Sequence, residues 1–127
     1  MGFLLTRNAD CLLALLYAQY KRNMKTMEHG KAVMMGDASD LKEKIGTKFS
    51  EEELLDFCWE LVDNELITGG KYSNTLFSIK LLPAGIAYIE NQKAEKRSTI
   101  YQEIKEWSST VASLVSGLGL FGLPPAP

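Results

Sequence analysis

The segment that begins at Ser50 constrains the fold more than any other part of the chain. Ser50 is followed by three consecutive glutamates, Glu51 to Glu53, and this capping-box pattern predicts the first turn of a helix. At 100° per residue the apolar side chains gather on one face, and these are Leu54, Phe57, Cys58, Leu61 and Val62. The sequence therefore predicts an amphipathic helix that runs to about Asn64 and packs its apolar face into a core.

The opposite face of this helix is acidic, with Trp59 at its border. It carries Glu52, Glu53, Asp56, Glu60 and Asp63. Residues 51–65 hold seven carboxylates and no Lys or Arg, so the formal charge of -2 for the whole chain is a cancellation against a mildly basic remainder. Two interpretations stay open: a solvated helix surface, or a docking surface for a basic partner.

Length and cysteine usage indicate one ordinary domain. The 127 residues, 46% of them apolar, can bury a core without a disulfide or metal. Cys11 and Cys58 lie in apolar helical patterns and indicate small buried side chains in a reducing compartment, with a disulfide between them as the less favoured alternative. We expect a cytoplasmic protein, because Arg7 and Asp10 interrupt the apolar start and no cleavage site typical of a secretory signal follows.

Hydrophobic periodicity and turn residues predict the remaining elements. They are a helix from Thr6 or Asn8 to about Asn23, an edge strand within Lys31–Met35, a short helix Ser39–Ile45 capped by Ser39, two strands (Leu66–Thr68 and Thr75–Leu82), a helix from Pro83 to about Lys93, and a further helix from Ser98 to about Val115. In the second strand of the ribbon, alternation predicts Leu76, Ser78 and Lys80 on one face and Phe77, Ile79 and Leu81 on the other.

The stretch from Ser108 to Pro127 has no charged side chain. A membrane span is not expected, because the residues from Val111 to Leu123 would extend only ~20 Å as a helix against a hydrocarbon thickness of ~30 Å. Attachment to a membrane surface is a weaker account, since no basic flank is near. We favour packing across a homodimer. The side chains expected there are Leu12, Leu16, Ile104, Trp107, Leu114, Leu118 and Phe121.

No catalytic constellation is visible. His29 is the only histidine, beside Glu28 in a loop rich in Met and Lys, and such a histidine is more often inert than a ligand or a general base. Two separated cysteines and one histidine do not form a zinc-binding spacing. We therefore expect no enzyme activity, no cofactor, no metal and no small-molecule substrate.

Three motifs in order carry a resemblance to a known superfamily. They are Asp40–Gly46 (DLKEKIG), Ser50–Ile67 ending in LVDNELI, and Leu81–Glu90 (LLPAGIAYIE). The chain resembles the winged helix-turn-helix superfamily over about residues 8–93, including small bacterial and phage YjcQ-like proteins and PadR- and MarR-type regulators. The resemblance implies a mainly α fold with a small β-wing. Residues 1–93 would form the winged-helix domain, and residues 94–127 a C-terminal helix with an apolar, uncharged Gly/Pro tail.

In superfamily members that bind DNA, the long second helix enters the major groove and the wing contacts the backbone. Here that helix would bring its carboxylates to the phosphates, which lowers affinity. We therefore predict a non-catalytic protein-interaction module or inhibitor that binds a basic protein. Its contacts would be Glu52, Glu53, Asp56, Trp59, Glu60 and Asp63 within the acidic helix 51–65.

The alternative is a small DNA-binding transcription regulator of the kind found in phages and mobile elements. It would contact DNA through the wing residues Lys71, Tyr72, Ser73 and Asn74. Lys21, Arg22 and Lys25, with Lys42, Lys44 and Lys48, would add a second basic region if the fold brings them together.

Overall fold

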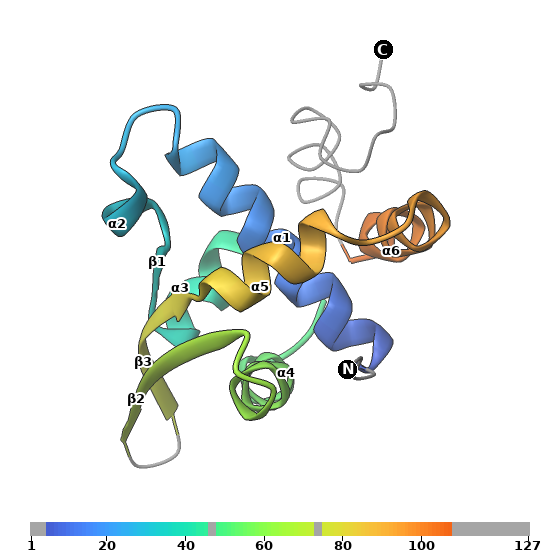
Figure 1. Cartoon of the computed structure of the whole chain (residues 1–127). Coiled ribbons are helices and arrows are strands. Elements are labelled where there is room, and N and C mark those ends of the chain that lie inside the picture. The colour runs from blue at the N-terminus through green and yellow to red at the C-terminus, as the bar shows by residue number, and fades with distance from the viewer. Residues whose placement is uncertain (1–4, 46–47, 73–74, 108–127) are drawn as a thin grey trace.

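The computed structural model describes residues 5–45, 48–72 and 75–107. Its elements are α1 (Arg7–Asn23), α2 (His29–Ala32), β1 (Met34–Gly36), α3 (Ala38–Ile45), α4 (Glu51–Asp63), β2 (Ile67–Tyr72), β3 (Thr75–Leu81), α5 (Pro83–Glu90) and α6 (Ala94–Lys105). The described part is mainly helical, with a small antiparallel sheet of strand order β1-β3-β2 (Figure 1). This arrangement agrees with the expected mainly α architecture with a small β element.

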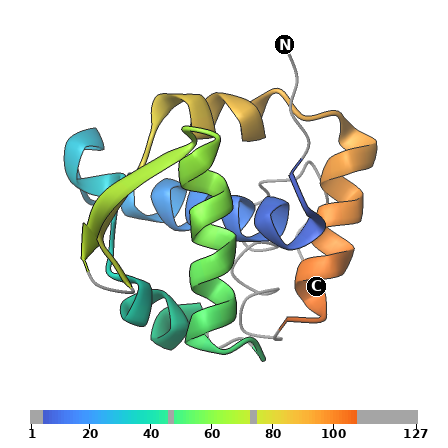
Figure 2. The same cartoon turned by 90° about the horizontal axis from the view of Figure 1, so that it is seen from below.

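Helix α1 is the centre of the fold. Thr6 caps it by accepting a hydrogen bond from the Ala9 N–H (3.3 Å), and from Ala9 to Tyr20 every side chain except Gln19 is buried. Figure 2 shows why, since α4 crosses one side of α1 while α5, α6 and the sheet lie around it. The predicted start and end of this helix are confirmed.

The first helix and the last one do not present the apolar surface expected for a dimer. Leu12, Leu16, Ile104 and Trp107 are each at most 4% exposed within a single chain. Trp107 packs with its ring centroid 4.8 Å from that of Phe49. These four side chains therefore belong to the core of one chain, a correction to their expected place in an interface. The other expected dimer residues, Leu114, Leu118 and Phe121, lie outside the described residues, so the homodimer stays a prediction.

The capping box of α4 is confirmed in both directions. The Glu53 N–H donates to Ser50 Oγ (3.1 Å), and the Ser50 N–H donates to Glu53 Oε1 (3.0 Å). Leu54, Cys58 and Leu61 are buried against the rest of the core. The predicted apolar face is therefore the one that packs inward.

The predicted alternation of β3 is wrong at Leu76 and Phe77. Thr68 pairs with Lys80 but Gly70 pairs with Phe77, so β3 has one extra residue between these rungs. Ser78 takes a φ of +50° there, and its N–H donates to Asp37 Oδ1 (2.9 Å). This bulge reverses the phase of the strand. As a result Leu76 is buried together with Ile79 and Leu81, whereas Phe77 is exposed.

Several predicted boundaries also differ. Ser39 lies inside α3 and does not cap it, since α3 begins at Ala38. Lys31 belongs to α2, and the edge strand begins at Met34. Helix α5 ends at Glu90, and α6 begins at Ala94 instead of Ser98. The sequence pattern missed α2 and the separate start of α6 because both segments contain few apolar residues.

None of the described helices is long and apolar enough to cross a membrane.

Candidate interaction surface on helix α4

Helix α4 lies on the outside of the fold, in front of α1 in the view from below (Figure 2). Five of its acidic side chains are exposed: Glu51, Glu52, Glu53, Asp56 and Asp63. Glu53 is held by the capping box. We call Glu52, Asp56 and Asp63 the acidic face, because at 100° per residue they fall on one side of α4 and they are not used by the cap.

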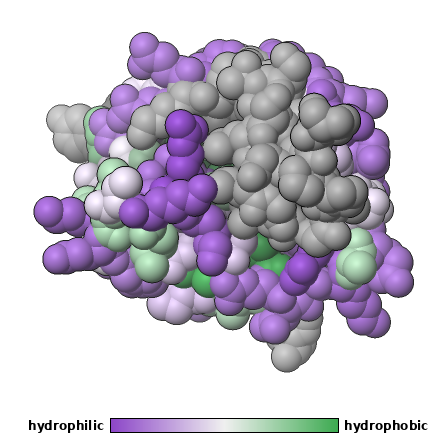
Figure 3. Space-filling model, turned by 90° about the horizontal axis from the view of Figure 1, so that it is seen from above, coloured by the Kyte–Doolittle hydropathy of each residue, from purple (hydrophilic) through white to green (hydrophobic). Residues whose placement is uncertain are grey.

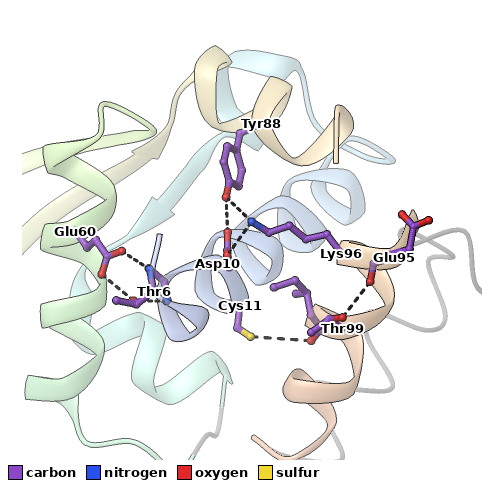
Figure 4. A network of polar contacts seen from close by, with 10 residues as sticks. Thr6, Asp10, Cys11, Glu60, Tyr88, Glu95, Lys96 and Thr99 are labelled. Carbon is purple, nitrogen blue, oxygen red and sulfur yellow. Dashed lines mark hydrogen bonds and ion pairs between the residues drawn. The ribbon is translucent and has the colours of Figure 1, made fainter. Parts of the chain in front are cut away.

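Glu60 does not belong to this face. The backbone N–H of Thr6 donates to Glu60 Oε2 (2.6 Å), and the Thr6 hydroxyl donates to Oε1 (2.8 Å), as Figure 4 shows. Both oxygens therefore anchor α4 to the N-terminus of α1, where a negative charge also interacts favourably with the helix dipole. These contacts give Glu60 a role within the chain, so we leave it out of the acidic face, and its contact with a partner stays a prediction.

Glu60→Ala is expected to lower the free energy of unfolding by about 2 kcal/mol, because two hydrogen bonds to a carboxylate at a helix N-terminus are lost. Asp56→Ala is the matched control, one turn earlier on the same helix and exposed, and should change stability by no more than about 0.5 kcal/mol. Urea unfolding followed by circular dichroism measures both. Equal stability of the two variants would contradict the anchoring role of Glu60.

Trp59 is half-buried on α4, and one side chain of the wing lies over its ring. Lys71 Nζ, from β2, lies 5.3 Å from the centroid of the Trp59 ring, within the range of a cation–π contact. The wing lysine therefore faces α4 and lies beside the acidic face. Of the other predicted wing residues, Tyr72 ends β2, and its side chain, like Ser73 and Asn74, lies outside what the structure describes.

The acidic face has no cationic partner in the described part of the chain. The ion pairs there join Arg7 to Glu103 (3.3 Å) and Lys96 to Asp10 (3.3 Å), and neither involves α4. Glu52 and Asp56 are one helical turn apart, so their charges repel each other. A cation brought to this face would relieve that repulsion.

The residues expected to form a second basic region lie in two separate parts of the fold. Lys21 and Arg22 lie in the last turn of α1, and Lys25 follows in the turn after it. Lys42 Nζ donates to the Phe49 carbonyl oxygen, and Lys48 Nζ lies 5.6 Å from the Phe49 ring centroid. Lys42 and Lys48 therefore support the connection from α3 to α4. The side chain of Lys44 lies outside the described residues.

Sequence reasoning missed a buried polar network around Asp10. Asp10 is 3% exposed. Its Oδ1 accepts a hydrogen bond from the Tyr88 hydroxyl (2.6 Å), and its Oδ2 lies 3.3 Å from Lys96 Nζ (Figure 4). Burial is the main cause that raises the pKa of Tyr88, and the bond to Asp10 adds to it. The signal was available in the sequence as a carboxylate inside an otherwise apolar helix. The network joins α1, α5 and α6, so we assign it to stability.

The remaining candidate groups are accounted for by packing. Cys11 and Cys58 are buried free thiols, as predicted. His29 begins α2 and does not lie in a loop; its Nδ1 is 3.0 Å from the Tyr20 hydroxyl. Within residues 5–45, 48–72 and 75–107, no three His, Cys, Asp or Glu side chains form a group that could hold a metal ion.

Comparison with protein-family models finds no match to this chain. Neither a curated protein nor a solved structure matches it.

Proposed function

We propose that this chain is a cytoplasmic winged helix-turn-helix protein that acts without catalysis, by binding a basic protein through the acidic face of α4. Two features support the superfamily. Apart from the four-residue helix α2 after α1, the elements follow the order helix, strand, helix, helix and two-stranded ribbon, and β3 lies between β1 and β2. The buried free thiols of Cys11 and Cys58 suit a reducing compartment.

The observation that carries the proposal is that the carboxylates of the acidic face form no ion pair in the described part of the chain. Glu52, Asp56 and Asp63 are exposed on the helix that leads into the wing, and among the described residues no lysine or arginine pairs with them. A polyanion placed against this helix would meet three carboxylates and release no counterions from them. A basic protein would instead gain charge complementarity, which speeds association and selects partners.

The edge of the face adds an aromatic contact. Trp59 is half-buried under Lys71, so a partner arginine that displaced Lys71 could stack on the indole ring. The cores of protein interfaces are enriched in aromatic residues and are surrounded by polar rims. This favours a partner rich in arginine over one rich in lysine, because a planar guanidinium stacks on rings and pairs with carboxylates.

The second candidate is a DNA-binding regulator, and Lys71 is the observation that favours it. Lys71 is exposed on β2 beside α4, where a wing meets the phosphate backbone in DNA-binding members of the superfamily. A single lysine neutralises one phosphate, whereas the acidic face opposes several. We therefore place DNA binding second.

Removing the charge of the acidic face should weaken binding of a basic protein. In Glu52→Gln/Asp56→Asn/Asp63→Asn, three exposed charges are lost while the side-chain shapes are kept. The affinity for a synthetic arginine-rich peptide should fall about tenfold, because each exposed charge contact contributes roughly 0.5 kcal/mol. Fluorescence anisotropy at low salt and at increasing salt measures the affinity and the number of charges involved.

The matched control removes three exposed carboxylates elsewhere, in Glu28→Gln/Glu95→Gln/Glu106→Gln. It changes the net charge by the same amount but leaves the acidic face of α4 intact. It should therefore keep most of the affinity for the arginine-rich peptide. If the two triple variants lose affinity equally, only the net charge matters and the acidic face is a solvated surface.

A further inference from the structure

Exposed methionines gather in the segment that follows α1. The large hydrophobic side chains most exposed in the described residues are Met24 (42%), Met27 (46%), Met34 (54%) and Phe77 (37%). Three of these four fall within eleven residues of one another in the sequence. Apolar side chains clustered on a surface and surrounded by polar ones mark interaction sites more often than scattered ones do.

These methionines lie among basic residues. Lys21, Arg22 and Lys25 are exposed near Met24 and Met27 in the sequence, Lys31 is exposed on α2, and Glu28 is the one exposed carboxylate in this segment. None of these four cations pairs with a carboxylate in the described part of the chain. In Figure 3, on the side where α2 lies in Figure 1, pale green side chains sit among hydrophilic purple ones. We call Met24, Met27, Lys21, Arg22 and Lys25 the basic methionine patch.

The backbone beneath the patch is held in place. The Tyr20 hydroxyl lies 3.0 Å from His29 Nδ1, and the two rings meet edge to face with centroids 5.5 Å apart. Asn23 Nδ2 donates to the Ala32 carbonyl oxygen (3.2 Å). These contacts fold α2 back onto the end of α1. The methionines are therefore presented on a fixed turn, which lowers the entropy cost of binding there.

The chemistry of the patch selects its occupant. Methionine surfaces adapt to the apolar stripe of a bound helix, and a positive rim attracts negative charge. A nucleic-acid backbone would use the cations but gain nothing from two exposed thioethers. A membrane surface is better anchored by aromatic residues than by methionine. An acidic amphipathic helix uses both components of the patch.

We propose that the basic methionine patch is a docking site for an acidic amphipathic helix of a partner protein. The apolar stripe of that helix packs on Met24 and Met27, and its acidic flanks contact Lys21, Arg22 and Lys25. This site is separate from the acidic face of α4. Neutralising Glu52, Asp56 and Asp63 should therefore leave it intact, so the two proposals fail independently.

The test uses the full chain and a labelled synthetic helix of about 18 residues, long enough to form a helix on binding, with leucine at i, i+3, i+4 and i+7 and Glu or Asp elsewhere. We expect micromolar affinity by anisotropy. Met24→Gln/Met27→Gln should weaken it about tenfold through lost apolar burial, with the salt dependence unchanged. Lys21→Gln/Arg22→Gln/Lys25→Gln should weaken it about tenfold and reduce the salt dependence. Lys80→Gln/Lys93→Gln/Lys105→Gln is the matched control and should bind like the wild type.

Four results would overturn the proposal. A scrambled peptide of the same composition could bind equally well, which would mean that charge alone acts. Phosphatidylserine vesicles or a random DNA duplex could bind with the same losses in the variants, which would assign the patch to a membrane or to nucleic acid. The wild type could self-associate in competition with the peptide, which would make a second copy the occupant.

Discussion

Gly85→Ala should lower the free energy of unfolding by about 2–4 kcal/mol, the range of backbone displacement or overpacking in a core. Gly85 is buried in α5. A methyl group there would overlap the backbone carbonyl oxygen of Leu66 and come within 3.0 Å of Leu81 Cδ1. The Leu66 carbonyl cannot move away easily, because it accepts a hydrogen bond from the Leu82 N–H (3.1 Å). Helix α5 would have to shift away from the start of β2.

Gly30→Ala is the matched control for this prediction. Gly30 lies in α2, with nothing within 4 Å of an added methyl group, so alanine should be neutral or stabilise by up to about 1 kcal/mol. Urea unfolding of both variants at neutral pH gives the comparison. A Gly85→Ala variant as stable as the wild type would mean that α5 does not pack this closely on Leu66.

The second large effect is a loss of stability at alkaline pH. Burial raises the pKa of the Cys58 thiol to about 12 from an ordinary value of 9.0. Burial, followed by the nearby carboxylates of Glu103 and Asp10, does the same for Cys11. Between pH 9 and 12 the unfolded chain therefore loses these two protons while the folded chain keeps them. The contribution of the two buried thiols to the free energy of unfolding is therefore fully present below pH 9. Above pH 9 the free energy of unfolding falls, by up to about 1.4 kcal/mol per pH unit for each thiol.

Unfolding by urea at several pH values between 8 and 11, in the presence of a reductant, measures this slope. Tyr17 and Tyr88 act in the same direction, because the fold also raises the pKa of each phenol above 10.0. Cys58→Ala isolates one thiol. It lowers stability at pH 8 by leaving a small cavity, but its stability should decline less steeply with pH than that of the wild type. An unchanged slope in Cys58→Ala would contradict burial of this thiol in the folded state.

Local patterns predicted the helices well where one segment contained the whole signal. The capping box at Ser50, the apolar face of α4 and Pro83 at the start of α5 each depend on neighbours a few residues away. The sequence did not predict hydrogen bonds between side chains that are distant from each other in the chain. Glu60 looked like one more surface carboxylate, because nothing near it indicates Thr6, 54 residues earlier.

The bulge in β3 shows a second limit of sequence patterns. Alternation assumes a regular strand, and one residue out of phase exchanges the two faces. Ser78 is not a glycine, so its positive φ gave no warning in the sequence. The interaction of its N–H with Asp37, 41 residues earlier, stabilises that conformation. The basic methionine patch was also hidden, because apolar residues in a turn usually indicate burial.

The claim that α4 faces a basic protein and not DNA has a direct test in duplex binding. A labelled random DNA duplex is titrated with the wild type, with Lys71→Gln and with Glu52→Gln/Asp56→Asn/Asp63→Asn at low salt. We predict no micromolar binding by the wild type, and tighter duplex binding once the carboxylates are neutralised, because the repulsion of phosphates is removed. Micromolar, salt-sensitive duplex binding by the wild type, lost in Lys71→Gln, would contradict the account and favour a DNA-binding regulator.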